Sequence, residues 1–172
     1  MFESMLDKEL TVTIVRVATL RETLGLKEVP PNGTAWHALI QEGLSVRSLA
    51  SAAKALGLTE KSFAALLEIN PRTLAARKKA KRLSAHESDL VYAIARAYVK
   101  LAGVRGADAA AAWMKAPSPE LKGAIPLEFI RSRIGTEYVT TVIDRERAVH
   151  FAKQQPIISP SEDSEDEGDV ED

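Results

Sequence analysis

LTEKSFAALLEINPRTLAARKKAKR, residues 58–82, predicts two short helices joined by a tight turn. Thr59 is a suitable N-cap for the first helix, because a threonine hydroxyl accepts a hydrogen bond from a backbone N–H that the helix leaves unpaired. Asn70 followed by Pro71 marks the start of the second helix, since asparagine caps helices and proline favours their first position. The stretch therefore predicts a helix-turn-helix, and the rest of the chain is organised around it.

The second helix of this stretch is strongly basic, with six basic residues and no acidic residue from Arg72 to Arg82. Such a helix fits the major groove of DNA, where cations neutralise phosphates and a few side chains reach base edges. A solvated basic helix face is the alternative interpretation. The predicted DNA contacts are Arg72 and Thr73 for bases or nearby phosphates, and Arg77, Lys78, Lys79, Lys81 and Arg82 mainly for phosphates.

The composition predicts an aliphatic, all-α fold. The 172 residues are 45% hydrophobic but only 5% aromatic, and alanine and leucine dominate. The absence of cysteine excludes disulfides and thiolate metal sites and makes a reducing cytoplasm the expected location. No apolar run reaches the roughly 18 residues of a membrane span, and the N-terminus lacks the pattern of a secretory signal.

The net charge of −1 conceals a strong asymmetry along the chain. Eight of the 24 acidic residues lie in residues 162–172, which leaves 16 acidic against 23 basic residues in residues 1–160, a formal charge of +7. A basic body favours a nucleic-acid contact. Residues 155–172 contain too few apolar side chains to offset the entropy of ordering, so we expect a disordered acidic tail.

The N-terminal part of the chain contains several further helix signals. Residues 10–17 are rich in β-branched side chains and fit either a short strand or the start of a helix that ends at Gly25. Thr34 is the predicted cap of a helix over residues 35–42, and Ser45 starts the next one. Ser84 and Glu87 match a capping box before the longest amphipathic helix, which we expect to end at a break over residues 103–106.

The C-terminal part reads as a separate small helical unit. Residues 107–115 predict a short alanine-rich helix, and Pro126 opens another with Leu127, Ile130 and Ile134 on its inner side. Gly135 is the expected stop of that helix, and Thr136 the expected cap of the last one. The predicted divisions are 1–33, an N-terminal segment that is a candidate dimerisation arm, 34–104, the helix-turn-helix domain, 105–154, the C-terminal domain, and 155–172, the tail.

The sequence shows no catalytic or metal-binding pattern. Its three histidines, His37, His86 and His150, are far apart and have no ligand spacing. Phosphate-binding loops, nucleophile elbows and dinucleotide-binding motifs are absent. We therefore expect no enzymatic activity, no metal and no cofactor. Trp36 and Trp113 lie among apolar neighbours, which favours core packing over an exposed interface.

Two segments together resemble the Xre-like antitoxins of the RES–Xre, MbcA-like toxin–antitoxin systems. One is LTEKSFAALLEINPRTLAARKKAKRLSAHESD, residues 58–89, and the other is ADAAAAWMKAPSPELKGAIPLEFIRSRIGTEYVTTVI, residues 107–143. The resemblance spans roughly residues 34 to 147. This chain departs from the family in having Lys122–Gly123 where a typical member has Gly-Gly, and in adding the acidic tail.

The resemblance implies a homodimer that neutralises a RES-domain toxin, an enzyme that destroys NAD, and that represses its own operon through the helix-turn-helix. The C-terminal domain would bind the toxin and block its active site. Acidic side chains there could pair with cations of an NAD pocket, and basic ones with acidic groups of the toxin. The candidate toxin-binding residues are Trp113, Glu128, Arg131, Arg133, Glu137, Asp144, Arg145 and Arg147.

Two other functions remain open at this point. One is a stand-alone DNA-binding regulator whose C-terminal domain serves dimerisation or a small ligand. The other is a helical interaction adaptor without a DNA role. Co-purification with a RES-domain protein encoded nearby separates these alternatives from an antitoxin.

Overall fold

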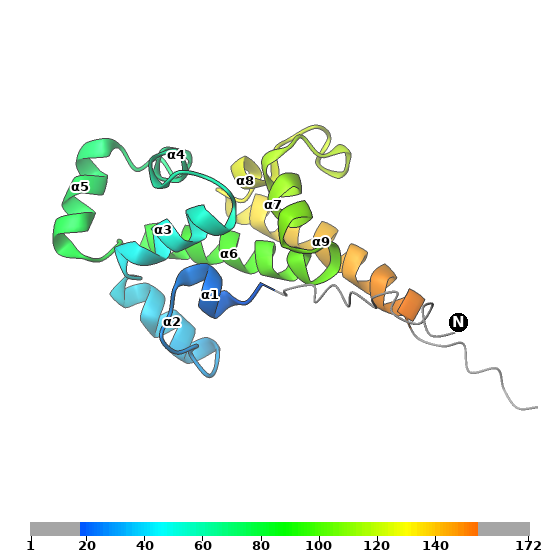
Figure 1. The fold of residues 1–172 in the computed structure, drawn as a ribbon, viewed down its shortest axis with the longest axis horizontal. Helices are drawn as coiled ribbons and strands as arrows, with labels where there is room; N and C mark the ends of the chain where they lie inside the picture. Colours follow the sequence, from blue (N-terminus) through cyan, green and yellow to red (C-terminus); the bar gives the residue numbers. More distant parts are fainter. Residues whose placement is uncertain (1–17, 155–172) are drawn as a thin grey trace, which may run out of the picture.

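The fold is given by a computed structural model, which describes residues 18–154. Over this range the regular structure is helical, and the extended pairing is limited to one antiparallel bridge between Ser45 and Arg82. The all-α prediction is therefore confirmed (Figure 1). The elements are α1 (Leu20–Leu24), α2 (Gly33–Glu42), α3 (Val46–Ala55), α4 (Glu60–Leu66), α5 (Pro71–Ala80), α6 (Ala85–Arg105), α7 (Ala107–Lys115), the 3₁₀ turn η1 (Pro119–Leu121), α8 (Pro126–Phe129) and α9 (Arg133–Gln154).

Helix α6 is the centre of the fold. It contacts α1, α2 and α3 from the N-terminal part and α7 and α9 from the C-terminal part (Figure 1). Its predicted apolar face is buried, with Val91, Ile94, Tyr98 and Leu101 at most 3% exposed. Because one helix serves both parts, a single cluster of buried side chains runs through them.

The predicted starts of α3, α4, α5 and α6 are confirmed. The side chains of Ser45, Thr59, Asn70 and Ser84 each accept a hydrogen bond from a backbone N–H of the first turn. Glu87 completes the capping box at α6, where its carboxylate accepts from the Ser84 N–H at 2.7 Å. These starts were predictable because each signal acts within four residues of sequence.

One boundary prediction in the N-terminal part was wrong, and another lies outside the described residues. Asn32 rather than Thr34 caps α2, with its Oδ1 accepting from the Ala35 N–H at 2.9 Å. Helix α6 ends within the predicted break, at Arg105 with Gly106 as its cap, after passing through Gly103, which lies on an exposed side where a missing side chain costs no packing. Helix α1 ends at Gly25 as expected, and residues 10–17 lie outside the described range.

Gly135 does not stop a helix but lies in the first turn of α9. A Cβ at this position would lie 1.7 Å from the Phe129 carbonyl oxygen, so glycine lets α9 start directly against the end of α8. Thr136 is not a cap either, since its hydroxyl donates to the carbonyl oxygens of Ile130 and Ser132. The tight corner also puts Ile134 outside the core, with 77% of it exposed.

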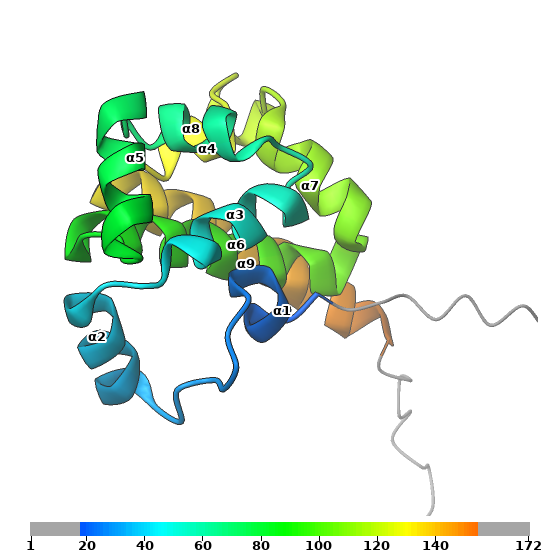
Figure 2. The same ribbon diagram turned by 60° about the vertical axis from the view of Figure 1, so that its left-hand side comes forward.

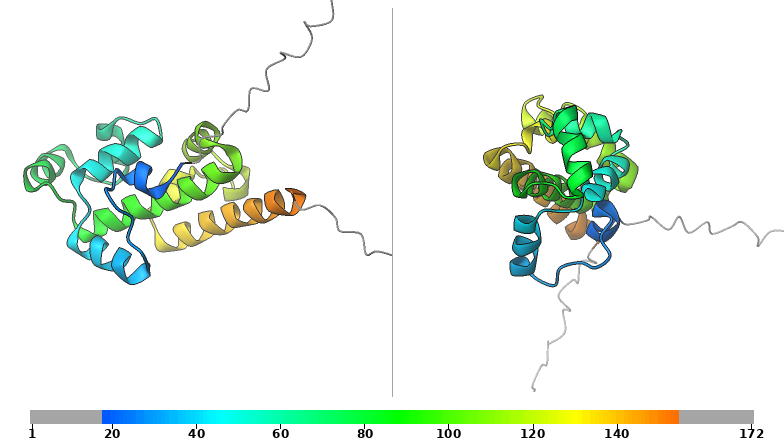
Figure 3. Two further views of the ribbon diagram at one scale, coloured as in Figure 1. Left: turned by 60° about the horizontal axis from the view of Figure 1, so that its bottom comes forward. Right: turned by 90° about the vertical axis from the view of Figure 1, so that its left-hand side faces the viewer.

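Helix α9 lies alongside α6, and its C-terminal turns extend past the end of α6 (Figure 3). Val139 and Ile143 are its fully buried contacts with the core. In Figure 1, α5 and the C-terminal end of α9 lie at opposite ends of the molecule.

Candidate functional site

Helix α5 buries one side chain against the core and is exposed over most of its length. Leu74 is its one buried side chain, and Asn70 fixes its first turn by accepting from the Thr73 N–H at 2.8 Å. The turn before it contains Glu68, a non-glycine residue in the left-handed conformation at φ 60°. The result is a helix that lies at the outer edge of the fold beside α4 (Figure 2).

Three of the basic residues predicted to bind DNA are engaged within the chain. The Arg77 Nε lies 2.7 Å from a Glu87 carboxylate oxygen of α6, and the Lys78 Nζ lies 2.5 Å from Glu60 of α4. The Arg82 guanidinium donates to the backbone carbonyl oxygens at the end of α2, at 3.1 and 3.2 Å. These cations hold α5 against its neighbours, so they are less available to phosphates.

The remaining predicted cations are free to meet a ligand. Arg72, Lys79 and Lys81 are exposed and form no ion pair with any residue in the range 18–154. Thr73 is half-buried at the start of α5. Ala65 and Ala75 line a shallow groove between α4 and α5, with a volume of about 320 Å³. The helix thus offers a smooth face with free positive charge at both ends.

The pairing of Arg77 with Glu87 determines the charge state of Glu87. Burial by itself raises the pKa of Glu87, but hydrogen bonds from Arg77 and Ser84 and the charge of Arg77 outweigh it, so the pKa lies below its usual range. Glu87 is therefore ionised at neutral pH while only 8% exposed. The charged form of the buried Glu87 carboxylate is stabilised by Arg77 and Ser84.

Some of the predicted C-terminal residues hold the domain together. Trp113 is half-buried under Arg105, whose Cζ lies 5.5 Å from the centroid of the Trp113 ring. Arg105 in turn makes two hydrogen bonds to Glu146, at 2.5 and 2.7 Å. This stack joins α7, α6 and α9, which gives Trp113 a packing role.

Asp144 likewise fastens α9 to α6. Both of its oxygens accept from the Lys100 Nζ at 2.9 Å, and Arg147 lies 3.6 Å away. The hydrogen bond from Lys100 is the main cause of a pKa of Asp144 below its usual range. We place Asp144 and Arg147 among the residues that orient α9.

The other five predicted residues do not lie together. Arg131 pairs with Glu68 of the α4–α5 turn, and Arg133 pairs with Glu137 at 3.2 Å within α9. Arg131, Arg133 and Glu137 all line a groove of about 440 Å³ between α6 and the start of α9. Arg145 lies in a different groove farther along α9. Within the described part of the chain, Glu128 and Arg145 have no ion-pair partner.

Sequence reasoning missed a set of exposed apolar side chains on α8 and α9. Apart from Val29, every large apolar residue that is exposed in the described range lies there, namely Phe129, Ile134, Tyr138, Val149 and Phe151. The signal was present, because α9 has apolar residues at helical spacing on two faces, of which the core uses only one.

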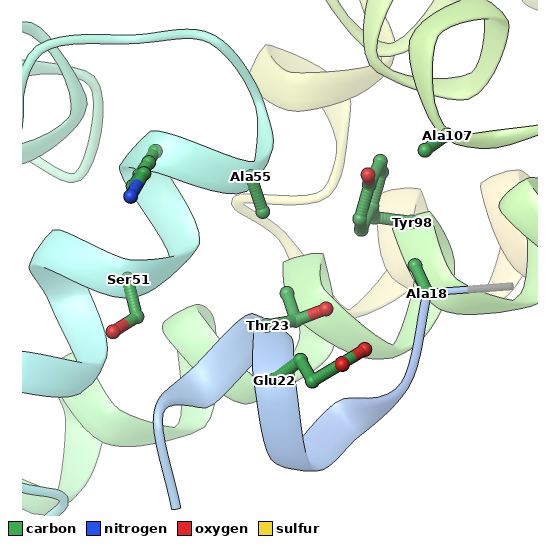
Figure 4. Close-up of a pocket in the computed structure, with 8 residues that line it drawn as sticks. Ala18, Glu22, Thr23, Ser51, Ala55, Tyr98 and Ala107 are labelled. Atoms are coloured by element: carbon green, nitrogen blue, oxygen red, sulfur yellow. The ribbon is translucent and has the colours of Figure 1, made fainter. Parts of the chain in front are cut away.

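A cavity of about 450 Å³ lies between α1, α3 and the α6–α7 corner (Figure 4). Small side chains such as Ala18, Ala55 and Ala107 form much of its wall. Burial and the nearby charge of Asp108 raise the pKa of Tyr98 on this wall, so its phenol is neutral at neutral pH. We assign this cavity no chemistry.

In the described part of the chain, no group of three or more potential ligand residues is arranged to hold a metal ion. Among the helices between residues 18 and 154, none combines the length and apolarity of a membrane span.

Comparison with protein families gives two adjoining matches. Residues 35–96 match the model of the antitoxin Xre-like helix-turn-helix domain. Residues 100–148 match the model of the antitoxin Xre/MbcA/ParS C-terminal toxin-binding domain. Among curated proteins, no sequence matches this chain. The first match covers the surface of α5, and the second covers α7, α8 and most of α9. The chain therefore belongs to the Xre-like antitoxins, with a DNA-binding helix-turn-helix domain followed by a toxin-binding domain.

Proposed function

We propose that this antitoxin neutralises a RES-domain toxin that degrades NAD, and that it represses its own operon as a homodimer. The observation that carries the proposal is the presence of the two antitoxin domains on one shared helix, α6. The resemblance of residues 34 to 147 to antitoxins of RES toxins supports the identity of the partner. The chain acts by binding rather than by catalysis, and both of its targets place it in the cytoplasm.

The DNA contact is made by the free cations of α5. Arg72 at the start of the helix and Lys79 and Lys81 at its end contact phosphates, and Thr73 lies where the N-terminal turn approaches base edges. Arg77, Lys78 and Arg82 contribute mainly by fixing the position of α5. Few side chains are therefore left to read bases.

Sequence specificity then comes from the dimer. Two copies of α5 on a two-fold axis read a palindrome whose half-sites lie about 34 Å apart, one turn of the duplex. Three phosphate contacts per copy give a steep salt dependence, since each contact contributes about 0.9 to the slope of log K against log salt.

Toxin neutralisation is a problem of access. The C-terminal domain covers the entrance of the toxin's active site, so that NAD no longer enters. No group of the antitoxin has to react, which agrees with the packing and pairing roles of Trp113, Asp144 and Arg147 described above.

The test uses the full chain and the protein encoded beside it, which we expect to be a RES-domain protein. We expect the two to co-purify, and the complex to shift a DNA fragment from upstream of the operon. Binding to that DNA by the chain alone, without capture of the RES-domain protein, would instead identify a stand-alone regulator. Capture of the toxin without any DNA shift would remove the autorepression half of the proposal.

A further inference from the structure

Several exposed apolar side chains of α8 and α9 lie on one side of α9. We use the name apolar stripe for the exposed Phe129, Ile134, Tyr138 and Val149 together with the half-buried Val142. At 100° per residue, the four members on α9 fall within about 80° of the helix circumference. Ile134 is 77% exposed and Val149 is 54% exposed. Phe129 joins them from α8, with its ring centroid 6.1 Å from that of Tyr138 in an edge-on arrangement.

The stripe borders a groove on α9. Its volume is about 550 Å³, and Tyr138, Val142 and Val149 form its apolar part. Its charged lining residues, which we call the rim, are Arg105, Glu120, Arg145 and Glu146. Apolar side chains combined with charged and polar ones are usual at a protein interface.

Within the described part of the chain, one charged side chain of the rim has no polar partner of its own. Glu146 is held by Arg105, and Glu120 accepts a hydrogen bond from the Ser118 hydroxyl. Arg145 is exposed and has no hydrogen bond or ion pair with any residue in the described range. A partner that covers the groove therefore has to supply a carboxylate to avoid burying Arg145 unpaired.

The position of the stripe identifies what covers it. Phe129, Ile134, Tyr138 and Val142 lie inside residues 100–148, the part of the chain that matches a toxin-binding domain. We propose that the toxin docks on the apolar stripe, placing apolar side chains against Tyr138 and Val142 and a carboxylate on Arg145. This inference rests on the proposed function for the identity of the toxin.

The test compares truncations on two faces of the same helix. Tyr138→Ala removes a side chain of the apolar stripe that is 47% exposed. Phe151→Ala is the control, because Phe151 is 48% exposed but lies outside the stripe, on the opposite side of α9. With the RES-domain protein encoded beside the chain as the probe, we expect Tyr138→Ala and Ile134→Ala each to weaken binding at least about tenfold. Phe151→Ala should change it less than about twofold. Arg145→Glu should weaken it by at least about tenfold.

Folding and oligomeric state are checked separately. Each variant should melt at the wild-type temperature, because the removed side chains are exposed. Hydrogen exchange on the wild-type complex gives a readout without any substitution, and we expect new protection over residues 129–149. Protection confined to other segments would overturn the proposal, as would a change from dimer to monomer in Ile134→Ala.

The remaining outcomes separate this inference from the proposed function. If the wild-type chain does not bind the RES-domain protein at all, both are wrong. If it binds and the stripe variants bind equally well, the toxin identity stands and the docking surface is wrong.

Discussion

Some cations of α5 are paired within the chain and others are free, and this difference predicts distinct changes in the free energy of unfolding. Arg77→Met removes the guanidinium that lies 2.7 Å from Glu87 and leaves that carboxylate with the Ser84 N–H as its donor. A hydrogen bond to a charged group contributes about 1.5–3 kcal/mol. Because a third of the Arg77 side chain is exposed, water replaces part of it. We expect the free energy of unfolding to fall by about 1–2 kcal/mol.

The same substitution should change how stability depends on pH. The folded pKa of Glu87 lies below its ordinary value of 4.5, so the pair contributes stability that is fully present above that value and is lost as pH falls through the folded pKa. Without Arg77, the pKa of Glu87 rises. The difference in unfolding free energy between wild type and Arg77→Met should therefore be full at pH 7 and shrink below about pH 4.5. Urea denaturation at several pH values measures it.

The comparison variant replaces Lys79 and Lys81, the two lysines of this region that have no ion pair in the described range. Lys79→Gln with Lys81→Gln should reduce the salt slope of operator binding by about 0.9 per lysine and per copy bound. Its unfolding free energy should stay within about 0.5 kcal/mol of wild type, since both side chains are exposed. If Arg77→Met leaves stability unchanged and lowers the salt slope as the lysine variants do, the assignment of Arg77 as a positioning residue is wrong.

Three further substitutions test the fold. Gly135→Ala should cost about 1–3 kcal/mol or more, because its Cβ would lie 1.7 Å from the Phe129 carbonyl oxygen; wild-type stability in denaturant would contradict that packing. Lys122→Gly should stabilise the chain by up to about 1 kcal/mol, because Lys122 has φ 55° and glycine adopts this conformation without strain; a lower melting temperature would argue against it. Asn70→Ala should cost about 1 kcal/mol by removing the cap of α5, measurable by the same denaturation.

The sequence was most informative where one residue and its near neighbours decide the structure. The caps at Ser45, Thr59, Asn70 and Ser84 all work within a single helical turn, and all four were predicted. The Gly-Gly pattern from which Lys122 departs also has a local reason, since residues 122 and 123 both adopt positive φ, which favours glycine.

What depends on packing was harder to predict. Gly135 has the sequence appearance of a helix stop, but it allows α9 to start against α8, and the resulting corner exposes Ile134. The basic run of α5 gives no sign that Arg77 faces Glu87, because the partner lies on another helix. Charge counting therefore identifies the basic helix but not which of its cations are free of partners.

The most direct test is NAD consumption by a RES-domain protein whose gene we expect beside that of this chain. With an equimolar amount of the full chain added, we expect the NAD concentration to stay at the level of the toxin-free control. Tyr138→Ala should restore consumption, and Phe151→Ala should not. Unchanged NAD loss in the presence of the wild-type chain would contradict the central claim that this antitoxin blocks an NAD-degrading toxin.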